Sequence, residues 1–335
     1  MFRYLIRRVL WAMVLFVAVT IVTYVIFYAI PADPARLACG QRATAECIKR
    51  AAHYLGTDRP LYVQYGKFFG RLMPVAGLNP SDFAPHFKTP NLGRSFTNRL
   101  SVNYVVLNAA PVTASLVFGG AVFWMLIALP VGILSALRPR SLLDRIAMVF
   151  VLVGISAHPV WIGLLMAYFL GFKAGLFPIT GYCDFINPSG DCGGPVQWAY
   201  HLVLPWATFA FLFSALYVRM IRANVMEALG EDYVRTARAK GAPEWLVMRS
   251  HVLRNALLPV VTMLGMDIGI ALGGAIFTES VYGLPGLGKT AINAISNFDL
   301  PTTQGVVVFA TLCIILFNLF VDLLYAWIDP RIRLS

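Results

Sequence analysis

Apolar residues along this chain gather in six long blocks, which polar and charged segments separate. The blocks are Val9–Ile30, Pro111–Leu137, Ile146–Phe172, Leu202–Ile221, Leu257–Phe277 and Gly305–Ile328. Each reaches the roughly 20 residues that a helix needs to cross about 30 Å of hydrocarbon. The pattern predicts an all-α, polytopic membrane protein with six transmembrane helices.

Composition agrees with this pattern. Of the 335 residues, 59% are hydrophobic and 13% are charged, and the mean hydropathy is +0.70. Soluble domains are about 45–50% apolar and about 25% charged. The composition therefore excludes a disordered chain, a coiled coil and a water-soluble enzyme.

The net charge is +11, and the cations are concentrated on one side of the predicted bundle. One side carries Arg3, Arg7, Arg8, Arg138, Arg140, Arg145, Arg219, Arg222, Arg235, Arg238, Lys240, Arg249, Arg254, Arg331 and Arg333. The short loops on the other side hold only Lys173 and Lys289. Cytoplasmic loops carry the excess of Lys and Arg, so both termini are expected in the cytoplasm. The cations form no basic face apart from these loops, which excludes a nucleic-acid-binding role.

Three regions follow from this topology. Residues 1–30 hold the N-terminus and the first transmembrane helix, and residues 31–110 form a large external loop. Residues 111–335 form the transmembrane core, which includes a cytoplasmic loop at 222–256. The external loop contains short amphipathic stretches such as Leu61–Phe69, and it is long enough to cap the external mouth or to dock a partner.

Four of the five cysteines lie in the two predicted external loops. Cys39 and Cys47 lie in the first loop and Cys183 and Cys192 in the second, while Cys313 lies in the last helix. Four thiols on an oxidising side allow three disulfide pairings. The local pairing, Cys39 with Cys47 and Cys183 with Cys192, closes two short loops. Free thiols or a bound metal remain the alternatives.

The cytoplasmic loop reads as two short helices joined by a turn. Four residues spaced by four, Val225, Leu229, Tyr233 and Ala237, would share one helical face. Gly241 is a C-terminal stop, and Pro243-Glu244 suits the first turn of a second helix. Trp245, Met248 and Val252 would line one side of that second helix.

Acids are mixed with the cations of this hairpin, at Glu227, Glu231, Asp232 and Glu244. The mixture favours a protein partner with a groove over an amphipathic linker that lies on the bilayer.

At this loop the sequence resembles ABC-importer permeases of the dipeptide/oligopeptide/nickel group, in particular their first (B-type) permease subunit. Gly230–Gly241 resembles the group's cytoplasmic EAA motif and His251–Pro259 its ending. Further matching segments are Phe2–Arg8, Ile30–Pro34, Leu55–Leu61 with Gln64-Tyr65, Asn91–Ser95, Leu143–Arg145, Pro285–Gly288, Asn318 with Asp322, and Asp329–Arg331. The chain departs from the group in several places. Of the pattern E-A-A-x3-G only Ala237 and Gly241 match, and Ala32 replaces a Gly. His158 stands where a small or apolar residue is more usual, and Asp267 where an uncharged residue is common.

The resemblance implies a non-catalytic permease subunit that forms half of a translocation pathway for di- or oligopeptides, with a nickel chelate or another small solute as the alternative. The implied partners are a second homologous permease, two cytosolic ATPase subunits that bind ATP and Mg²⁺, and an external substrate-binding protein. This chain would hold no cofactor and no metal, and it would lie in the cytoplasmic membrane of a prokaryote. The implied ATPase-coupling residues are Tyr233, Arg235, Thr236, Ala237, Arg238, Ala239, Lys240, Gly241, Ala242, Pro243 and Glu244.

The segment Gly283–Thr290 matches the phosphate-binding pattern G-x4-G-K-[ST] letter for letter. That loop needs a buried strand before it and a helix after it, so that its backbone N–H groups converge on phosphate. Here a transmembrane helix precedes it, and the topology places Lys289 outside the cell. The segment is better interpreted as an external Gly/Pro-rich turn near the pore mouth.

Four polar residues fall at or near hydrocarbon depth: Asp267, His158, Asn318 and Asp322. A lone Asp at a helix centre costs about 2.5–3.5 kcal/mol on insertion scales, so Asp267 should face protein or a watery cavity. It would contact either a cationic group of the substrate or a neighbouring helix. His158 is expected to cap a carbonyl freed by Pro159, and Asn318 with Asp322 to pair with Arg254 or with the partner permease.

Two classes of protein compete with this interpretation. A secondary transporter or channel would need no ATPase partner, and a membrane-embedded enzyme would need a clustered catalytic set that the sequence does not display. Neither needs a cytosolic docking hairpin, so the hairpin around Gly241 favours the permease.

Overall fold

The computed structural model describes residues 2–29, 34–39, 44–55, 60–72, 76–77, 86–87, 91–185 and 192–328. The long helices are α1 (Phe2–Tyr24), α5 (Val102–Leu137), α6 (Leu142–Ser156), α8 (Pro195–Gly230), α12 (Leu258–Leu272) and α15 (Leu300–Ile328). The shorter ones are α2 (Pro34–Cys39), α3 (Ala45–Leu55), α4 (Leu61–Leu72), α7 (Pro159–Met166), α9 (Asp232–Ala239), α10 (Glu244–Leu246), α11 (Arg254–Ala256), α13 (Ile276–Val281) and α14 (Leu287–Ser296). In the described part of the chain, π-helical segments are η1 (Val25–Ala29), η3 (Ala167–Lys173) and η4 (Val247–Leu253). A two-residue antiparallel ladder joins β1 (Ala76–Gly77) to β2 (His86–Phe87).

The predicted all-α membrane fold is confirmed. Within the described residues, four helices are long and apolar enough to cross a membrane: Ile6–Tyr28, Val102–Leu137, Pro195–Gly230 and Leu300–Leu323. Two bent helix pairs complete a total of six if each pair counts as one span. These are Leu142–Ser156 with Pro159–Lys173, bent by 111°, and Glu244–Ala256 with Leu258–Leu272, bent by 45°.

The helix boundaries differ from those of the predicted blocks, and three of the differences are notable. The second helix begins at Val102 rather than Pro111, because Val102, Val106 and Ala109 recur at helical spacing and are buried. The third block is two helices, because the chain is extended at His158 and Pro159 begins α7. The fifth block ends at Leu272 rather than Phe277.

The break after Leu272 is a property of Gly274. Its φ is +134°, and a Cβ there would lie 2.9 Å from the Cα of Gly288. Only glycine combines this backbone conformation with such a close approach.

The core of the bundle is the contact between α5 and α8. Trp124 on α5 lies against Phe209, Phe213 and Tyr217 on α8, with ring centroids 4.7–5.9 Å apart. Small residues let the backbones approach, since a Cβ on Gly132 would lie 2.9 Å from the Cβ of Ile221. Small residues at helix contacts are typical of membrane bundles, where van der Waals packing drives association.

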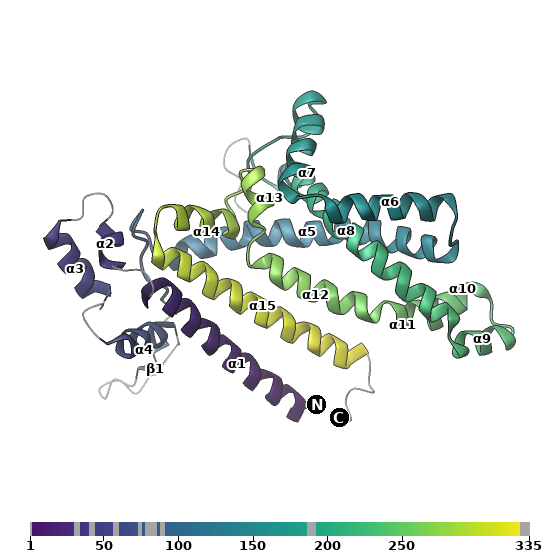
Figure 1. Ribbon diagram of the computed structural model, residues 1–335, viewed down its shortest axis with the longest axis horizontal. Coiled ribbons are helices and arrows are strands. Elements are labelled where there is room, and N and C mark those ends of the chain that lie inside the picture. The colour runs from purple at the N-terminus through teal and green to yellow at the C-terminus, as the bar shows by residue number, and fades with distance from the viewer. Residues whose placement is uncertain are drawn as a thin grey trace.

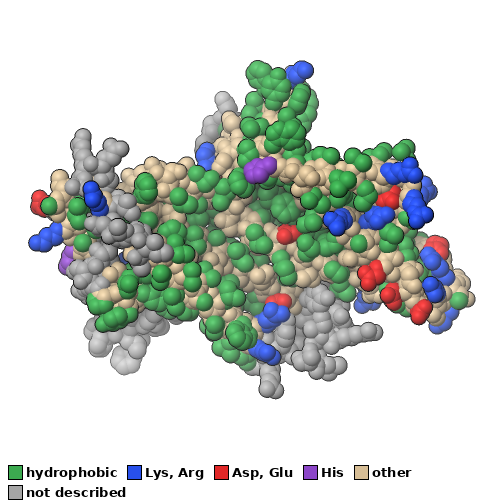
Figure 2. Space-filling model, in the orientation of Figure 1, with side chains coloured by type: hydrophobic (Ala, Val, Ile, Leu, Met, Phe, Trp, Pro, Cys, Tyr) green, Lys and Arg blue, Asp and Glu red, His purple; other side chains and the backbone are tan. Residues whose placement is uncertain are grey.

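The two ends of the bundle carry different structures (Figure 1): α2, α3 and α4 lie at one end, and α9 and α10 at the other. Figure 2 shows charged side chains gathered at the α9 end, with hydrophobic side chains spread over the middle of this face. The distribution is that expected of helices whose middle lies in hydrocarbon.

Candidate functional site

A helical hairpin is exposed between α8 and α12. Helix α8 stops at Gly230 because Glu231 is extended, with φ −72° and ψ 149°. Helix α9 follows, then a turn, and then α10, which continues through η4 and α11 toward the membrane. The Asn224 side-chain amide donates to the Ala256 carbonyl at 3.2 Å and ties the base of the hairpin together.

The turn at Gly241 has the hydrogen bonds of a Schellman motif. Gly241 N–H donates to the Arg238 carbonyl at 2.9 Å, and Ala242 N–H donates to the Ala237 carbonyl at 3.3 Å. The φ of Gly241 is +76°, and a Cβ there would have no heavy atom within 4 Å. The predicted stop is therefore present, and it depends on backbone conformation rather than on space.

One side of the hairpin is anchored to the bundle by Val234, Ala237, Val247 and Val252, which are at most 8% exposed. The predicted face was wrong at Tyr233, which is 38% exposed, because the break at Glu231 ends the four-residue periodicity. Trp245 is likewise 63% exposed, whereas Val252, expected on the same side of the second helix, is buried.

The position of Trp245 follows from the π-helical geometry of η4. That geometry brings residues five apart, Val247 and Val252, onto the same side. Trp245 is thereby left facing outward, where Arg249 lies over its ring at 6.0 Å.

The other side of the hairpin is open. Of the eleven predicted coupling residues, Ala237 is buried and Ala242 partly buried, and nine are exposed: Tyr233, Arg235, Thr236, Arg238, Ala239, Lys240, Gly241, Pro243 and Glu244. Arg238 bridges the turn to Glu244 with hydrogen bonds of 2.8 and 3.2 Å. The tip thus presents aromatic, apolar and charged groups on a rigid turn.

A buried ion pair beneath the hairpin was missed by the sequence reasoning. Arg222 on α8 donates to both oxygens of Asp144 on α6, at 2.7 and 3.0 Å, and Ser135 on α5 also donates to Asp144. The Arg140 backbone N–H donates at 2.8 Å. Asp144 thereby joins the ends of three helices on the hairpin side. An acid in the first turn of a membrane helix was the available signal.

Asp267, on α12, accepts a 2.7 Å hydrogen bond from the Tyr217 hydroxyl on α8. Tyr217 is fully buried, whereas Asp267 is partly exposed in this single chain. The neighbouring-helix contact considered for Asp267 is therefore present.

The remaining intramembrane predictions are corrected in detail. His158 does cap the kink, but its Nδ1 accepts from the Val160 N–H at 3.3 Å instead of satisfying a carbonyl, because the residue is the N-cap of α7. Asp322 pairs with Arg8 on α1 at 3.0 Å, not with Arg254, since α1 packs beside α15. Asn318 is exposed on α15.

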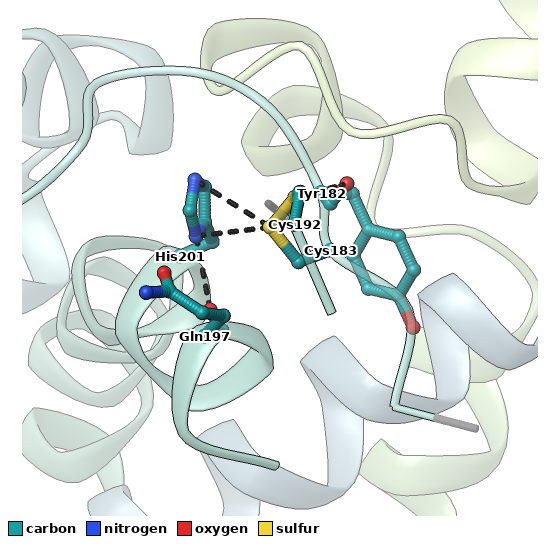
Figure 3. The surroundings of a disulfide bond; sticks show 5 residues. All are labelled: Tyr182, Cys183, Cys192, Gln197 and His201. Carbon is teal, nitrogen blue, oxygen red and sulfur yellow. Dashed lines mark hydrogen bonds between the residues drawn. A yellow bond between two sulfur atoms is a disulfide. The ribbon is translucent and has the colours of Figure 1, made fainter. Parts of the chain in front are cut away.

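The cysteines of the two loops are joined locally, Cys39 to Cys47 and Cys183 to Cys192, while Cys313 is free. Figure 3 shows His201 beside the second disulfide, with its Nδ1 3.3 Å from the Cys183 sulfur and 2.9 Å from the Gln197 carbonyl. Among the described residues this is the one group of three potential metal ligands. Its sulfurs bond to each other, whereas thiolates are the sulfur ligands of metals.

The Gly283–Thr290 segment forms a turn and the start of α14, at the end of the bundle that carries α2 to α4 (Figure 1). Its N–H groups do converge on an anion, but that anion is the carboxylate of Glu279, which is fully buried. The carboxylate accepts from Lys289 N–H at 3.0 Å and from the Thr113 hydroxyl at 2.7 Å. A Cβ on Gly286 would lie 2.4 Å from the Glu279 carboxyl carbon. The cradle is filled by this chain itself, and a nucleotide phosphate has no room there.

Glu279 and Thr113 were not singled out from the sequence, because they are 166 positions apart. Burial raises the pKa of the Glu279 carboxyl above its ordinary value, and the hydrogen bonds from Thr113, Lys289 and Gly288 only partly oppose that effect.

Known families match both halves of the chain. Residues 128–334 match the family "Binding-protein-dependent transport system inner membrane component", and residues 1–117 match "Binding-prot-dependent transport system membrane comp, N-term". The chain is 35% identical over 344 residues to the "Probable D,D-dipeptide transport system permease protein DdpB" of Escherichia coli (strain K12), covering 98% of this chain and 97% of the relative. It is 33% identical over 351 residues to the "Dipeptide transport system permease protein DppB" of the same organism, covering 99% of each.

A solved structure shares the fold. The MetNI methionine ABC transporter in an inward-facing conformation aligns with 68% of this chain and 97% of the matched chain, with a TM-score of 0.53 and 18% identity. At this identity the likeness concerns the fold alone.

Proposed function

This chain belongs to the binding-protein-dependent transport family as a permease subunit of an ABC importer, and from that premise we propose that it forms half of a peptide pathway. The other half would come from a second, homologous permease. Two cytosolic ATPase subunits would hold ATP and Mg²⁺, an external binding protein would deliver the substrate, and this chain would contribute no catalytic group. The assembly would lie in the cytoplasmic membrane of a prokaryote.

The peptide substrate is supported by the relatives of this chain. Those that match over almost the whole length, DdpB and DppB, are named as D,D-dipeptide and dipeptide permeases. A nickel chelate or another small solute remains the competing substrate class.

The single observation that carries the coupling role is the exposed hairpin at Gly241. Nine of its eleven candidate residues are exposed, while Val234 and Val247 anchor it rigidly to helices that continue through the membrane. Movement of the hairpin tip would therefore be transmitted directly to α8 and α12. A rigid element that carries ligand-driven motion into a helix bundle is a recognised form of hinge switching.

The proposed orientation places the hairpin in the cytosol. With each bent pair counted as one span, four crossings precede the hairpin and six precede the C-terminus. The hairpin and both termini then lie on one side, and that side carries the Lys and Arg excess, so the positive-inside rule supports a cytosolic location.

Substitutions at Gly241 test the coupling role in the reconstituted importer. Gly241→Asn should keep near-normal transport, because Asn tolerates positive φ, while Gly241→Ala should be mildly impaired at a strain cost of about 1–2 kcal/mol. Gly241→Asp places an acid on the docking surface and should lower both transport and substrate-stimulated ATP hydrolysis at least several-fold.

Gly175→Asp is the matched control, since Gly175 also has positive φ (+62°) and open surroundings but lies outside the hairpin. If Gly241→Asp transports like the control, the hairpin is not the docking element.

We propose in addition that Asp267 contacts the amino terminus of the peptide. Tyr217 engages only one oxygen of its carboxylate, Oδ2, and the side chain is partly exposed. Asp267→Asn keeps the shape and should reduce import of free-amine peptides about tenfold, as the loss of a charge-assisted contact of about 1.5 kcal/mol implies. Import of N-acetylated peptides should not change. If the ratio of free-amine to N-acetylated peptide import is the same in the variant as in the wild type, Asp267 has a purely structural role.

A further inference from the structure

A cavity of about 30 Å³ lies at the end of the bundle opposite the hairpin. Its lining comes from four segments: the end of α1, helix α4, residues 91–94 and the start of α15. The lining residues are Tyr24, Tyr28, Phe68, Arg71, Asn91, Leu92, Gly93, Arg94, Pro301 and Gln304. About 10–15 Å³ of such volume holds one water, so the cavity accommodates two or three oxygen-sized groups.

Hydrogen-bond donors dominate the polar lining. Gln304 is 3% exposed, and its Nε2 has no hydrogen-bond partner in the part of the chain that the structure describes. A buried unpartnered amide is costly, so the group calls for an acceptor. Arg71 and Arg94 add two guanidinium groups, and the Arg71 Nε donates to the Lys67 carbonyl at 3.3 Å. The oxygen of the Asn91 side chain is already engaged by Gly93 N–H at 2.9 Å. The cavity is therefore built for an anion with two or more oxygens.

The surroundings of the cavity are those of a membrane interface. Tyr24 stacks on Tyr28 with ring centroids 4.8 Å apart at the end of α1, where aromatic belts occur. The surface beside Tyr24 is apolar and open: Ile21, one turn before it on α1, is 43% exposed, and Val25, at the start of η1, is 44% exposed.

Helix α4 packs against the same end of α1. It buries Phe68 against Tyr24 and leaves Tyr62 77% exposed. An anionic ligand seated here would have its apolar part alongside α1.

We propose that this cavity binds the phosphate of an anionic phospholipid, with the acyl chains along the exposed side of α1. Two phosphate oxygens would enter between Gln304 and the two arginines. The position on the α1 side of α15, next to Val308 and the Tyr24 cluster, favours lipid over a transported solute. Under the proposed orientation the cavity faces the outer leaflet. Lipid binding there would be separate from the coupling role.

Native mass spectrometry of the purified importer tests the proposal, with dioleoylphosphatidylglycerol as the probe and dioleoylphosphatidylcholine as the comparison. The wild type should retain phosphatidylglycerol preferentially. The double variant Arg71→Gln/Arg94→Gln should lower that retention at least tenfold, and Gln304→Glu should do the same by placing an acid in the cavity. The matched control Arg99→Gln changes an exposed arginine that does not line the cavity and should retain lipid normally.

The outcomes are separable. Equal phosphatidylglycerol retention by wild type and both cavity variants would overturn the proposal. Competition by millimolar inorganic phosphate or by free dipeptide, with no preference between the two lipids, would assign the cavity to a free anion and would also overturn it. Thermal melts within 2 °C of wild type would show that the variants fold, and the Gly241 experiment is unaffected by either result.

Discussion

The buried Glu279 cradle provides the sharpest stability prediction. In Glu279→Ala, the Thr113 hydroxyl and the N–H groups of Gly288 and Lys289 lose their acceptor inside the protein. An unsatisfied buried donor costs about 1–3 kcal/mol. Removal of the buried charge offsets part of the combined cost of these three donors, which leaves a net loss of about 3–5 kcal/mol in the free energy of unfolding. At about 2 °C per kcal/mol, the melting temperature should fall by roughly 6–10 °C.

Thermal unfolding of the detergent-purified permease, followed by tryptophan fluorescence, measures this effect. Glu279→Gln retains the volume and one acceptor, so it should lose only about 1–3 kcal/mol. Glu227→Gln alters an exposed acid on α8 and should stay within about 0.5 kcal/mol of the wild type. A Glu279→Ala protein that melts with the control would refute the cradle and reopen the question of what the Gly283–Thr290 turn binds.

Three further results are expected. Burial raises the pKa of Glu279, so its stabilising contribution is complete below the unfolded pKa of about 4.3 and declines as pH rises through the folded pKa. In equilibrium unfolding, the stability advantage of wild type over Glu279→Gln should therefore shrink with rising pH. Asp144→Asn should cost about 2–4 kcal/mol by leaving Arg222 without its carboxylate, whereas Arg145→Gln, at an exposed neighbour, should be neutral in the same melt. Cys183→Ala/Cys192→Ala should lower stability by about 2–3 kcal/mol by opening a short loop, and an unchanged melt under reducing conditions would contradict that contribution.

Local rules predicted the parts of the structure that depend on neighbouring residues. The six apolar blocks correspond to helices or helix pairs, and Gly241 ends α9 because a left-handed residue and its two backbone bonds are coded within six positions. The same rules failed where the apolar pattern does not show that a helix bends. The block Ile146–Phe172 is apolar throughout, yet His158 and Pro159 divide it into two helices bent by 111°.

Contacts between distant segments were beyond such rules. Glu279 meets Thr113, and Asp322 meets Arg8, only after the bundle has assembled. Tyr233 was misplaced for a smaller reason, since one extended residue, Glu231, shifts the buried position to Val234. Buried polar partners of this kind are fixed by packing, to which periodicity is blind.

Site-specific photocrosslinking tests the central claim, that the hairpin between α9 and α10 is the docking element for the ATPase. A photoreactive phenylalanine at Thr236 or Lys240, both exposed, should form an adduct with an ATPase subunit in the assembled importer. The same group at Tyr62 on α4, 77% exposed at the opposite end, should form none with that subunit. Absence of ATPase adducts from both hairpin positions, together with an ATPase adduct from Tyr62, would contradict the account.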